Sequence, residues 1–252
     1  MVCISDEDKR LISRVDDLLY LSDKRNTPCF LGFLDLREQA LLRQKLRGVA
    51  ADRWCFFGGY DGAERALLAV YPDFYDPSVI EYPFSAVAFR YRGGQKLTHR
   101  DFLGTLLATG VRRDTIGDIL CGDGLTVVFL SHDIIPYICD QIQRVGGEGV
   151  TLIPDYNGPL PLSRSYLEIH DTVASPRLDA VVKTLIHSSR EEAAQLIRAG
   201  SVSVDHLPTD SVSCSLSAPC TVSVRGHGRY LIDRFGPETK KGRLQFTARK
   251  CN

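Results

Sequence analysis

The residues from 177 to 250 carry the pattern that most restricts how this chain can fold. Apolar residues recur at helical spacing from Leu178 to Ile186, and a second helix is predicted between the cap residue Ser189 and the stop residue Gly200. A short strand over 202–204 follows. Two short helices joined by a tight turn and followed by a strand indicate an αα-hairpin on a small sheet. Such a hairpin holds basic side chains on a rigid surface, which suits a structured nucleic acid.

Charge is distributed unevenly along the chain, although its formal net charge is zero. Residues 177–252 contain 12 lysines and arginines against 7 acidic residues, whereas residues 1–176 contain 19 against 24. A basic end on an acidic body is the distribution expected of a nucleic-acid-binding protein. Ordinary variation in composition gives similar counts, so charge alone leaves both interpretations open.

Length and composition are those of a globular protein with two or three small domains. The chain has 252 residues, of which 44% are hydrophobic and 25% are charged. No run of about 18 apolar residues occurs, so we expect no membrane span. The segment from Met1 to Lys9 is acidic where a signal peptide would be basic and then apolar, which predicts a cytoplasmic protein. The eight cysteines, Cys3 among them, form no C-x-x-C pair, so we expect core thiols and no metal site.

The first 80 residues are predicted to form a small α/β unit. Capping residues precede two helices, and apolar runs between turn residues indicate three strands. In chain order, the predicted elements are a helix at 5–21, a strand at 29–34, a helix at 35–47, and strands at 54–57 and 65–71. Three prolines, Pro72, Pro77 and Pro83, then indicate a linker.

Residues 83–157 are predicted to form a second unit in the order β-α-β-β-α-β. The predicted elements are a strand at 86–91, a helix at 98–108, strands at 116–121 and 125–130, a helix at 131–145 and a strand at 149–154. This order is the ferredoxin-like split βαβ that RNA-recognition (RRM-like) domains use. The aromatic strand on which such domains stack bases is missing, and we expect its one aromatic residue, Phe129, to lie in the core.

The third predicted unit spans residues 176–252, after a linker at 155–176 with an extended stretch from Tyr166 to Ile169. Its helical hairpin is followed by predicted strands at 202–204, 221–224, 229–233 and 243–248. The whole chain is therefore expected to be an α+β protein of three units.

The helical hairpin resembles the S4 RNA-binding domain over about 50 residues. The resemblance rests on four segments: Arg177-Leu178-Asp179, Ser189-Arg190 with Ala193, Leu196-Ile197 with Gly200, and Val202-x-Val204. Two turns depart from the usual S4 pattern, because Asp205-His206 stands where Asn-Gly is usual and Ala218-Pro219 stands where Gly-Asp is usual. The resemblance implies an RNA-binding surface on the helices.

The order of the three units is similar to that of the bacterial YlmH family. The segment from Leu106 to Leu120, with Arg112-Arg113 and Gly117-Asp118, carries the resemblance in the middle, and 223–230 and 238–243 carry it near the end. Membership would imply a ribosome-associated RNA-binding protein that acts on large subunits stalled with peptidyl-tRNA. It would also connect the chain with cell division.

Basic side chains of the third unit are the candidate RNA contacts. Arg190 follows a helix cap, where free N–H groups and the helix dipole favour a phosphate. The full candidate set in this unit is Arg177, Lys183, Ser189, Arg190, Arg198, Arg225, Arg229, Lys240, Lys241 and Arg243. Arg112 and Arg113 form a second candidate contact in the middle unit. They would bind A-form RNA through phosphates and shape. The alternative for each residue is a solvated surface charge.

Motifs of common enzyme classes are missing from the sequence. No phosphate-binding loop, dinucleotide fingerprint, nucleophile elbow or H-E-x-x-H occurs, and the six histidines are dispersed. We therefore expect a protein without cofactor, metal or catalytic residues, monomeric, whose partners are rRNA, tRNA as a second candidate, and the large ribosomal subunit. Two alternatives stay open: an S4-containing enzyme that modifies rRNA, and an adaptor that holds a division or quality-control partner with its acidic first unit.

Overall fold

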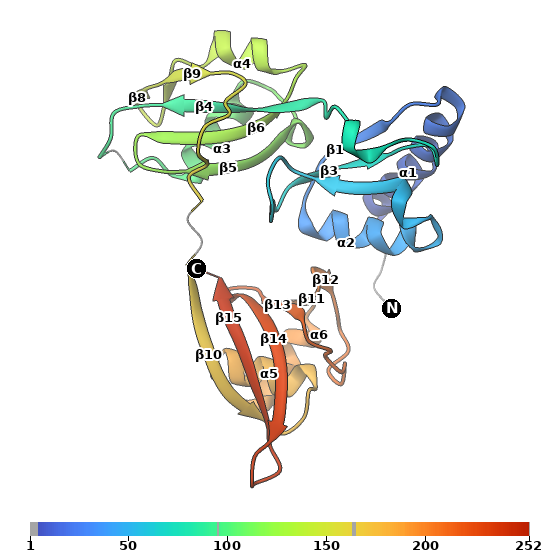
Figure 1. The fold of residues 1–252 in the computed structure, drawn as a ribbon. Helices are drawn as coiled ribbons and strands as arrows, with labels where there is room; N and C mark the ends of the chain where they lie inside the picture. Colours follow the sequence, from blue (N-terminus) through green and yellow to red (C-terminus); the bar gives the residue numbers. More distant parts are fainter. Residues whose placement is uncertain (1–4, 95, 163–164, 252) are drawn as a thin grey trace. The chain divides into compact units, whose positions relative to one another are not determined.

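The structure, a computed structural model, describes residues 5–94, 96–162 and 165–251. Cys3 lies outside the described residues. The described chain forms two compact units, residues 6–162 and residues 165–251 (Figure 1). The other seven cysteines are free thiols. None of the helices in the described ranges is both long and apolar enough to cross a membrane.

The first unit begins with a three-stranded antiparallel sheet covered by two helices (Figure 1). In chain order these are α1 (Asp6–Arg25), β1 (Cys29–Leu34), α2 (Leu36–Lys45), β2 (Trp54–Phe57) and β3 (Ala66–Val70), with sheet order β1-β3-β2. The predicted capping box at Asp35 is confirmed. Val15 of α1 and Leu42 of α2 are fully buried in one cluster with Leu68 of β3, so both helices pack on the same face of the sheet.

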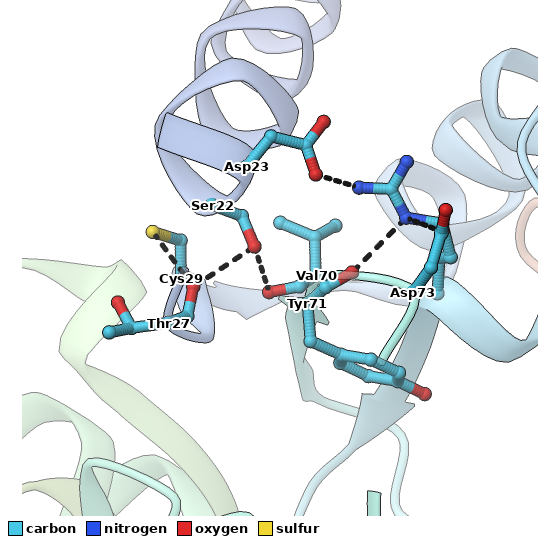
Figure 2. A network of polar contacts seen from close by, with 8 residues as sticks. Ser22, Asp23, Thr27, Cys29, Val70, Tyr71 and Asp73 are labelled. Atoms are coloured by element: carbon cyan, nitrogen blue, oxygen red, sulfur yellow. Dashed lines mark hydrogen bonds and ion pairs between the residues drawn. The ribbon is translucent and has the colours of Figure 1, made fainter. Parts of the chain in front are cut away.

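Helix α1 is one turn longer than its sequence predicts, and buried polar contacts hold that last turn (Figure 2). The hydroxyl of Ser22 donates to the carbonyl oxygens of Thr27, at 3.0 Å, and Val70, at 3.3 Å. Beside it, Arg53 Nε donates to the carbonyl oxygen of Tyr71 at 3.2 Å, and its guanidinium pairs with Asp23 and Asp73. The end of α1 is thereby tied to the end of β3 by contacts between residues distant in sequence.

The second half of this unit has the predicted split-βαβ order. Its elements are β4 (Phe84–Arg90), α3 (His99–Ala108), β5 (Ile116–Cys121), β6 (Leu125–Ser131), α4 (Ile135–Gln141), β7 (Arg144–Val145), β8 (Glu148–Gly149) and β9 (Thr151–Ile153). The antiparallel sheet has the order β5-β6-β4-β9, with α3 and α4 packed on one face. The helix predicted over 131–145 was wrong in length: Pro136 lies in the first turn of α4, and Gly146-Gly147 forms the turn between β7 and β8.

The two sheets of the first unit share a hydrophobic core. Phe33 and Leu67, from the first sheet, pack in one cluster with Ala88, Val127 and Phe129 from the second. All five are buried. The boundary predicted near residue 80 therefore separates two sheets that pack together within one compact unit.

The second unit has a six-stranded antiparallel sheet with two helices on one face (Figure 1). Its elements are β10 (Tyr166–Val173), α5 (Leu178–Leu185), α6 (Arg190–Arg198), β11 (Val202–Val204), β12 (Leu207–Pro208), β13 (Cys220–Val224), β14 (Gly228–Glu238) and β15 (Leu244–Cys251). The sheet order is β10-β15-β14-β13-β11-β12. Strand β10 falls in the segment predicted to be a linker, yet it pairs with β15 along its whole length, so the unit begins before residue 176.

Candidate nucleic-acid interface

The predicted αα-hairpin is formed by α5 and α6. Ser189 is the N-cap of α6, and its hydroxyl accepts a hydrogen bond from the backbone N–H of Glu192 at 3.1 Å. The apolar stripes of both helices, which include Val181, Val182 and Ile197, are fully buried against the sheet. Because these stripes face the core, the charged residues of both helices lie on the outer side, except for the buried Asp179.

A buried carboxylate organises two of the candidate arginines. Arg177 donates from Nε to Asp179 Oδ1 at 3.1 Å and from Nη2 to Oδ2 at 3.3 Å. Arg190 donates from Nε to Oδ2 of the same carboxylate at 2.8 Å, and the backbone N–H of Ala180 donates to Oδ1 at 3.0 Å. Asp179 is 2% exposed, whereas the side chains of Arg177 and Arg190 are 41% and 62% exposed. This Asp179 cluster (Arg177, Asp179 and Arg190) therefore presents two oriented guanidinium groups to solvent.

The Asp179 cluster carries a net positive charge. Burial alone would raise the pKa of Asp179, but the hydrogen bonds and charges of Arg177 and Arg190 outweigh burial and lower it. The hydrogen bond to Asp179 in turn raises the pKa of Arg177. Asp179 therefore favours its ionised form and Arg177 its protonated form. One carboxylate neutralises one of two guanidiniums, so the cluster attracts anions.

Three further candidate cations are exposed near the ends of the helices. Lys183 lies in the last turn of α5 and Arg198 in the last turn of α6, where a positive charge complements the helix dipole. Arg225 lies in the turn between β13 and β14, and its backbone N–H donates to the carbonyl oxygen of Ser201 at 2.9 Å. The fold thus places the Arg225 turn beside the segment that follows α6.

The loop between β14 and β15 carries the next three candidates and extends from the end of the sheet (Figure 1). Lys240 and Lys241 are exposed in this loop. Arg243 instead binds the neighbouring strand, because its Nε donates to Thr172 Oγ1 at 2.9 Å and its Nη2 to the Thr172 carbonyl oxygen at 2.5 Å. Arg243 therefore fixes the loop to β10, although it is exposed like the two lysines.

Arg229 lies on the other side of the sheet from the helices. Its neighbour Tyr230 on β14 is buried in the core under α5 and α6, and side chains alternate along a strand. The cross-strand partners of Arg229 are Ser223 and Cys251. The structure therefore does not bring Arg229 together with the candidates on the helices.

The two candidate arginines of the first unit have different environments. Arg112 is exposed and pairs with Asp114, with Nε 3.0 Å from Oδ1 and Nη2 3.1 Å from Oδ2. Arg113 is half-buried, and its Nη1 donates to the carbonyl oxygen of Ile116 at 2.5 Å. The two side chains do not form one exposed basic pair.

Comparisons with known proteins agree with this arrangement of units. The family model described as "Putative RNA-binding domain in YlmH" matches residues 78–156, and that of the S4 domain matches residues 176–213. The chain is 32% identical over 219 residues to the "Ribosome-associated protein quality control protein P2" of Bacillus subtilis, covering 85% of this chain and 84% of that one. The chain belongs to the YlmH family. A solved structure titled "Cell division protein ylmH from Streptococcus pneumoniae" aligns with 61% of this chain and 94% of its own at 20% identity, with a TM-score of 0.49.

In this member of the YlmH family, one face of the matched RNA-binding domain is covered by the chain itself. RNA-recognition domains of this topology stack bases on aromatic side chains of the sheet. Here Phe129 on β6 is 4% exposed, as its sequence context predicts, and Tyr60 stacks on it with ring centroids 5.6 Å apart. Phe33 and Leu67 of the first sheet fill the same cluster. This face of the sheet is therefore part of a hydrophobic core.

Sequence reasoning did not identify the role of Asp179. Its carboxylate joins two arginines that are 13 positions apart in the chain, and this pairing arises only when α5 and α6 pack together. The sequence feature that could have indicated this contact is the position of Arg177 two residues before Asp179 at the start of a helix. Among residues 5–94, 96–162 and 165–251, no group of three or more His, Cys, Asp or Glu side chains is placed to hold a metal ion.

Proposed function

We propose that this YlmH-family chain is a non-enzymatic, cytoplasmic RNA-binding factor that works as a monomer on the large ribosomal subunit. Its S4 unit would contact rRNA, and its task would be quality control on subunits that have stalled with peptidyl-tRNA attached. Such subunits make tRNA a second RNA partner. The name of the Bacillus subtilis relative, a ribosome-associated quality control protein, supports this role, as does the match to an RNA-binding domain model.

The observation that carries the proposal is the Asp179 cluster. Two guanidinium groups held by a common buried carboxylate have lost most of their conformational freedom before RNA arrives. An oriented guanidinium can donate two parallel hydrogen bonds to a phosphate, and little further entropy is lost on binding. The cluster therefore favours a rigid, structured RNA backbone.

Exposed cations outside the cluster would supply the rest of the affinity. Lys183 and Arg198 on the helices, with Lys240 and Lys241 on the loop after β14, are exposed. Cations that neutralise phosphates release counterions, so their contribution falls steeply as salt rises. Because the major groove of A-form RNA is too deep and narrow for side chains to read, we expect recognition by shape and phosphate spacing.

Sedimentation with ribosomal subunits tests the proposal. The full chain should migrate with free large subunits in a sucrose gradient at low salt and leave them as salt is raised. The variant Arg190→Glu/Lys240→Glu/Lys241→Glu should stay at the top of the gradient with its circular dichroism spectrum unchanged. A control with the same charge change, Arg10→Glu/Arg25→Glu/Arg47→Glu, alters exposed residues of the first unit and should still migrate with the subunits.

Two results would contradict the proposal. A folded S4 triple variant that still migrates with large subunits would show that another surface makes the contact. Binding that does not change with salt would indicate a protein partner, because phosphate contacts release counterions.

A further inference from the structure

A pocket lies in the first unit, beside β1. Its volume is about 240 Å³, and α1, the end of β1, the start of α2 and the turn Arg113–Thr115 line it. Three cationic side chains reach it, from Arg14, Arg65 and Arg113. Leucines from α1 and β1 form its apolar wall. A cavity of this size can hold a small organic ligand in part.

The two half-buried arginines in this pocket are held by neutral groups. Arg65 donates from Nε to the carbonyl oxygen of Ile116 at 3.0 Å and from Nη2 to that of Phe33 at 2.6 Å. Arg113 donates from Nη1 to the same Ile116 oxygen at 2.5 Å. Within the described residues, neither guanidinium has a carboxylate at ion-pair distance. Two like charges thus lie close together in a partly desolvated site.

The pKa values of both arginines are lowered in this arrangement. Burial lowers the pKa of Arg65. Burial and then the nearby charge of Arg65 lower the pKa of Arg113 to about 10. Both groups remain protonated at neutral pH, so an anion bound between them would relieve the repulsion.

Three carboxylates, from Asp35, Glu38 and Asp114, line the pocket and restrict which anion fits. Asp114 pairs with Arg112 outside the pocket lining. Asp35 and Glu38 each use one oxygen in the capping box of α2, at 2.8 Å. Their other oxygens can accept hydrogen bonds from hydroxyl or amino groups. They also repel additional negative charge, which disfavours a polyphosphate. The pocket therefore suits one phosphate attached to a body with hydroxyl or amino donors.

We propose that this pocket binds a phosphate monoester of the nucleotide type, with its phosphate between Arg65 and Arg113 and its sugar or base toward Asp35 and Glu38. Arg14, which is exposed at the rim, adds a third donor to the phosphate. A free mononucleotide and the 5′-phosphorylated end of an RNA both have this chemistry. The site goes beyond the proposed function, because it does not use the S4 unit.

Calorimetric titration of the full chain at constant ionic strength tests this site. The probes are adenosine 5′-monophosphate, adenosine, and a tetraribonucleotide with or without a 5′-phosphate. We expect the monophosphate to bind and adenosine to bind at least about tenfold more weakly, because charge-assisted hydrogen bonds to the phosphate are lost. Competition by the 5′-phosphorylated tetranucleotide would identify an RNA end as the source, and its failure to compete would identify a free nucleotide.

Variants on one helix separate the pocket from general surface charge. Arg14→Gln should weaken binding of the monophosphate about tenfold. Arg10→Gln, an exposed change one turn earlier on α1 and outside the pocket, should leave binding unchanged. Arg113→Gln should also weaken binding of the monophosphate. If Arg113→Gln does not fold, Arg14→Gln still tests the site.

Three results would overturn the site: no binding of the monophosphate to the wild type, equal binding of adenosine, or wild-type binding by Arg14→Gln. The S4 triple variant distinguishes this failure from that of the proposed function. It should bind the monophosphate normally, and a loss there would place the phosphate on the S4 unit instead.

Discussion

We predict that the substitution Asp179→Asn weakens RNA binding, although it makes the chain more positive. It makes the S4 unit more positive by one charge, so general electrostatics predict tighter binding to RNA. Asp179 is, however, the common acceptor for Arg177 and Arg190, and it is 2% exposed. An amide of the same shape cannot accept all of these bonds, and its NH₂ group faces a donor. Both guanidiniums would therefore lose their fixed orientation.

The expected magnitude follows from the two side chains that are released. Ordering one flexible side chain on binding costs about 0.5–1.5 kcal/mol, so two arginines that are no longer ordered in advance cost about 1–3 kcal/mol. The positive charge that is no longer neutralised lies on the exposed guanidiniums of Arg177 and Arg190, and it adds back at most about 1 kcal/mol of binding free energy. The net loss of about 1–2 kcal/mol corresponds to roughly tenfold weaker binding.

The assay is a titration of purified large subunits with the full chain, measured by co-pelleting at fixed salt. Asp210→Asn is the matched control, because it adds the same charge to the S4 unit at an exposed carboxylate. We expect Asp210→Asn to bind as well as the wild type or slightly better, and Asp179→Asn to bind about tenfold more weakly. If both variants bound equally well, orientation by Asp179 would not matter and net charge alone would explain the affinity.

Four other predictions concern salt, pH and two glycines. Removing two charges in Lys240→Gln/Lys241→Gln should reduce the slope of log affinity against log salt by about 2, and an unchanged slope would show that neither lysine contacts phosphate. The pKa of Asp179 is lowered, so its stabilising bonds persist above the usual carboxyl range and are lost as pH falls through the folded-state value. The unfolding free energies of the wild type and Asp179→Asn should therefore converge in titrations below about pH 4. Gly32→Ala would place Cβ 2.6 Å from a backbone carbonyl oxygen and should destabilise the first unit by about 1–3 kcal/mol in denaturant titrations followed by tryptophan fluorescence. Gly104→Ala, with nothing within 4 Å, should stabilise helix α3 by up to about 1 kcal/mol in the same assay.

The starts of three helices were predictable because capping is local, whereas the start predicted at 131 was wrong, since α4 begins at Ile135. Asp35, Thr98 and Ser189 each stand three residues before the partner that completes the cap, so sequence spacing alone identifies them. The length of α4 was not predictable in the same way. The pair Gly146-Gly147 is equally compatible with a helix stop and a hairpin turn, and the fold uses it between β7 and β8.

Strand β10 could not be predicted in full from its own local sequence. Its sequence from Tyr166 to Val173 has few buried residues, and even Leu167 is exposed. It is a strand because β15 offers a complete set of backbone partners along eight residues. A linker and an edge strand can have the same local sequence and differ in whether another strand pairs with them. The partner here is β15, about 80 residues away, so the sequence around residue 166 does not reveal the pairing.

The candidate RNA residues differ in a way that net charge conceals. Arg177 and Arg190 are held by a buried carboxylate, whereas Lys240 and Lys241 are exposed on a loop. An oriented guanidinium fixes the direction of its hydrogen bonds and loses little entropy on binding. An exposed ammonium adds affinity through counterion release, and this affinity falls as salt rises. Arg113 belongs to neither group, because its side chain turns into the first unit. Sequence patterns locate all of these charges, but only the packed structure separates guanidiniums held by a buried carboxylate from exposed ammonium groups on a loop. The S4 unit is therefore expected to retain RNA specificity at salt concentrations at which the loop lysines no longer contribute affinity.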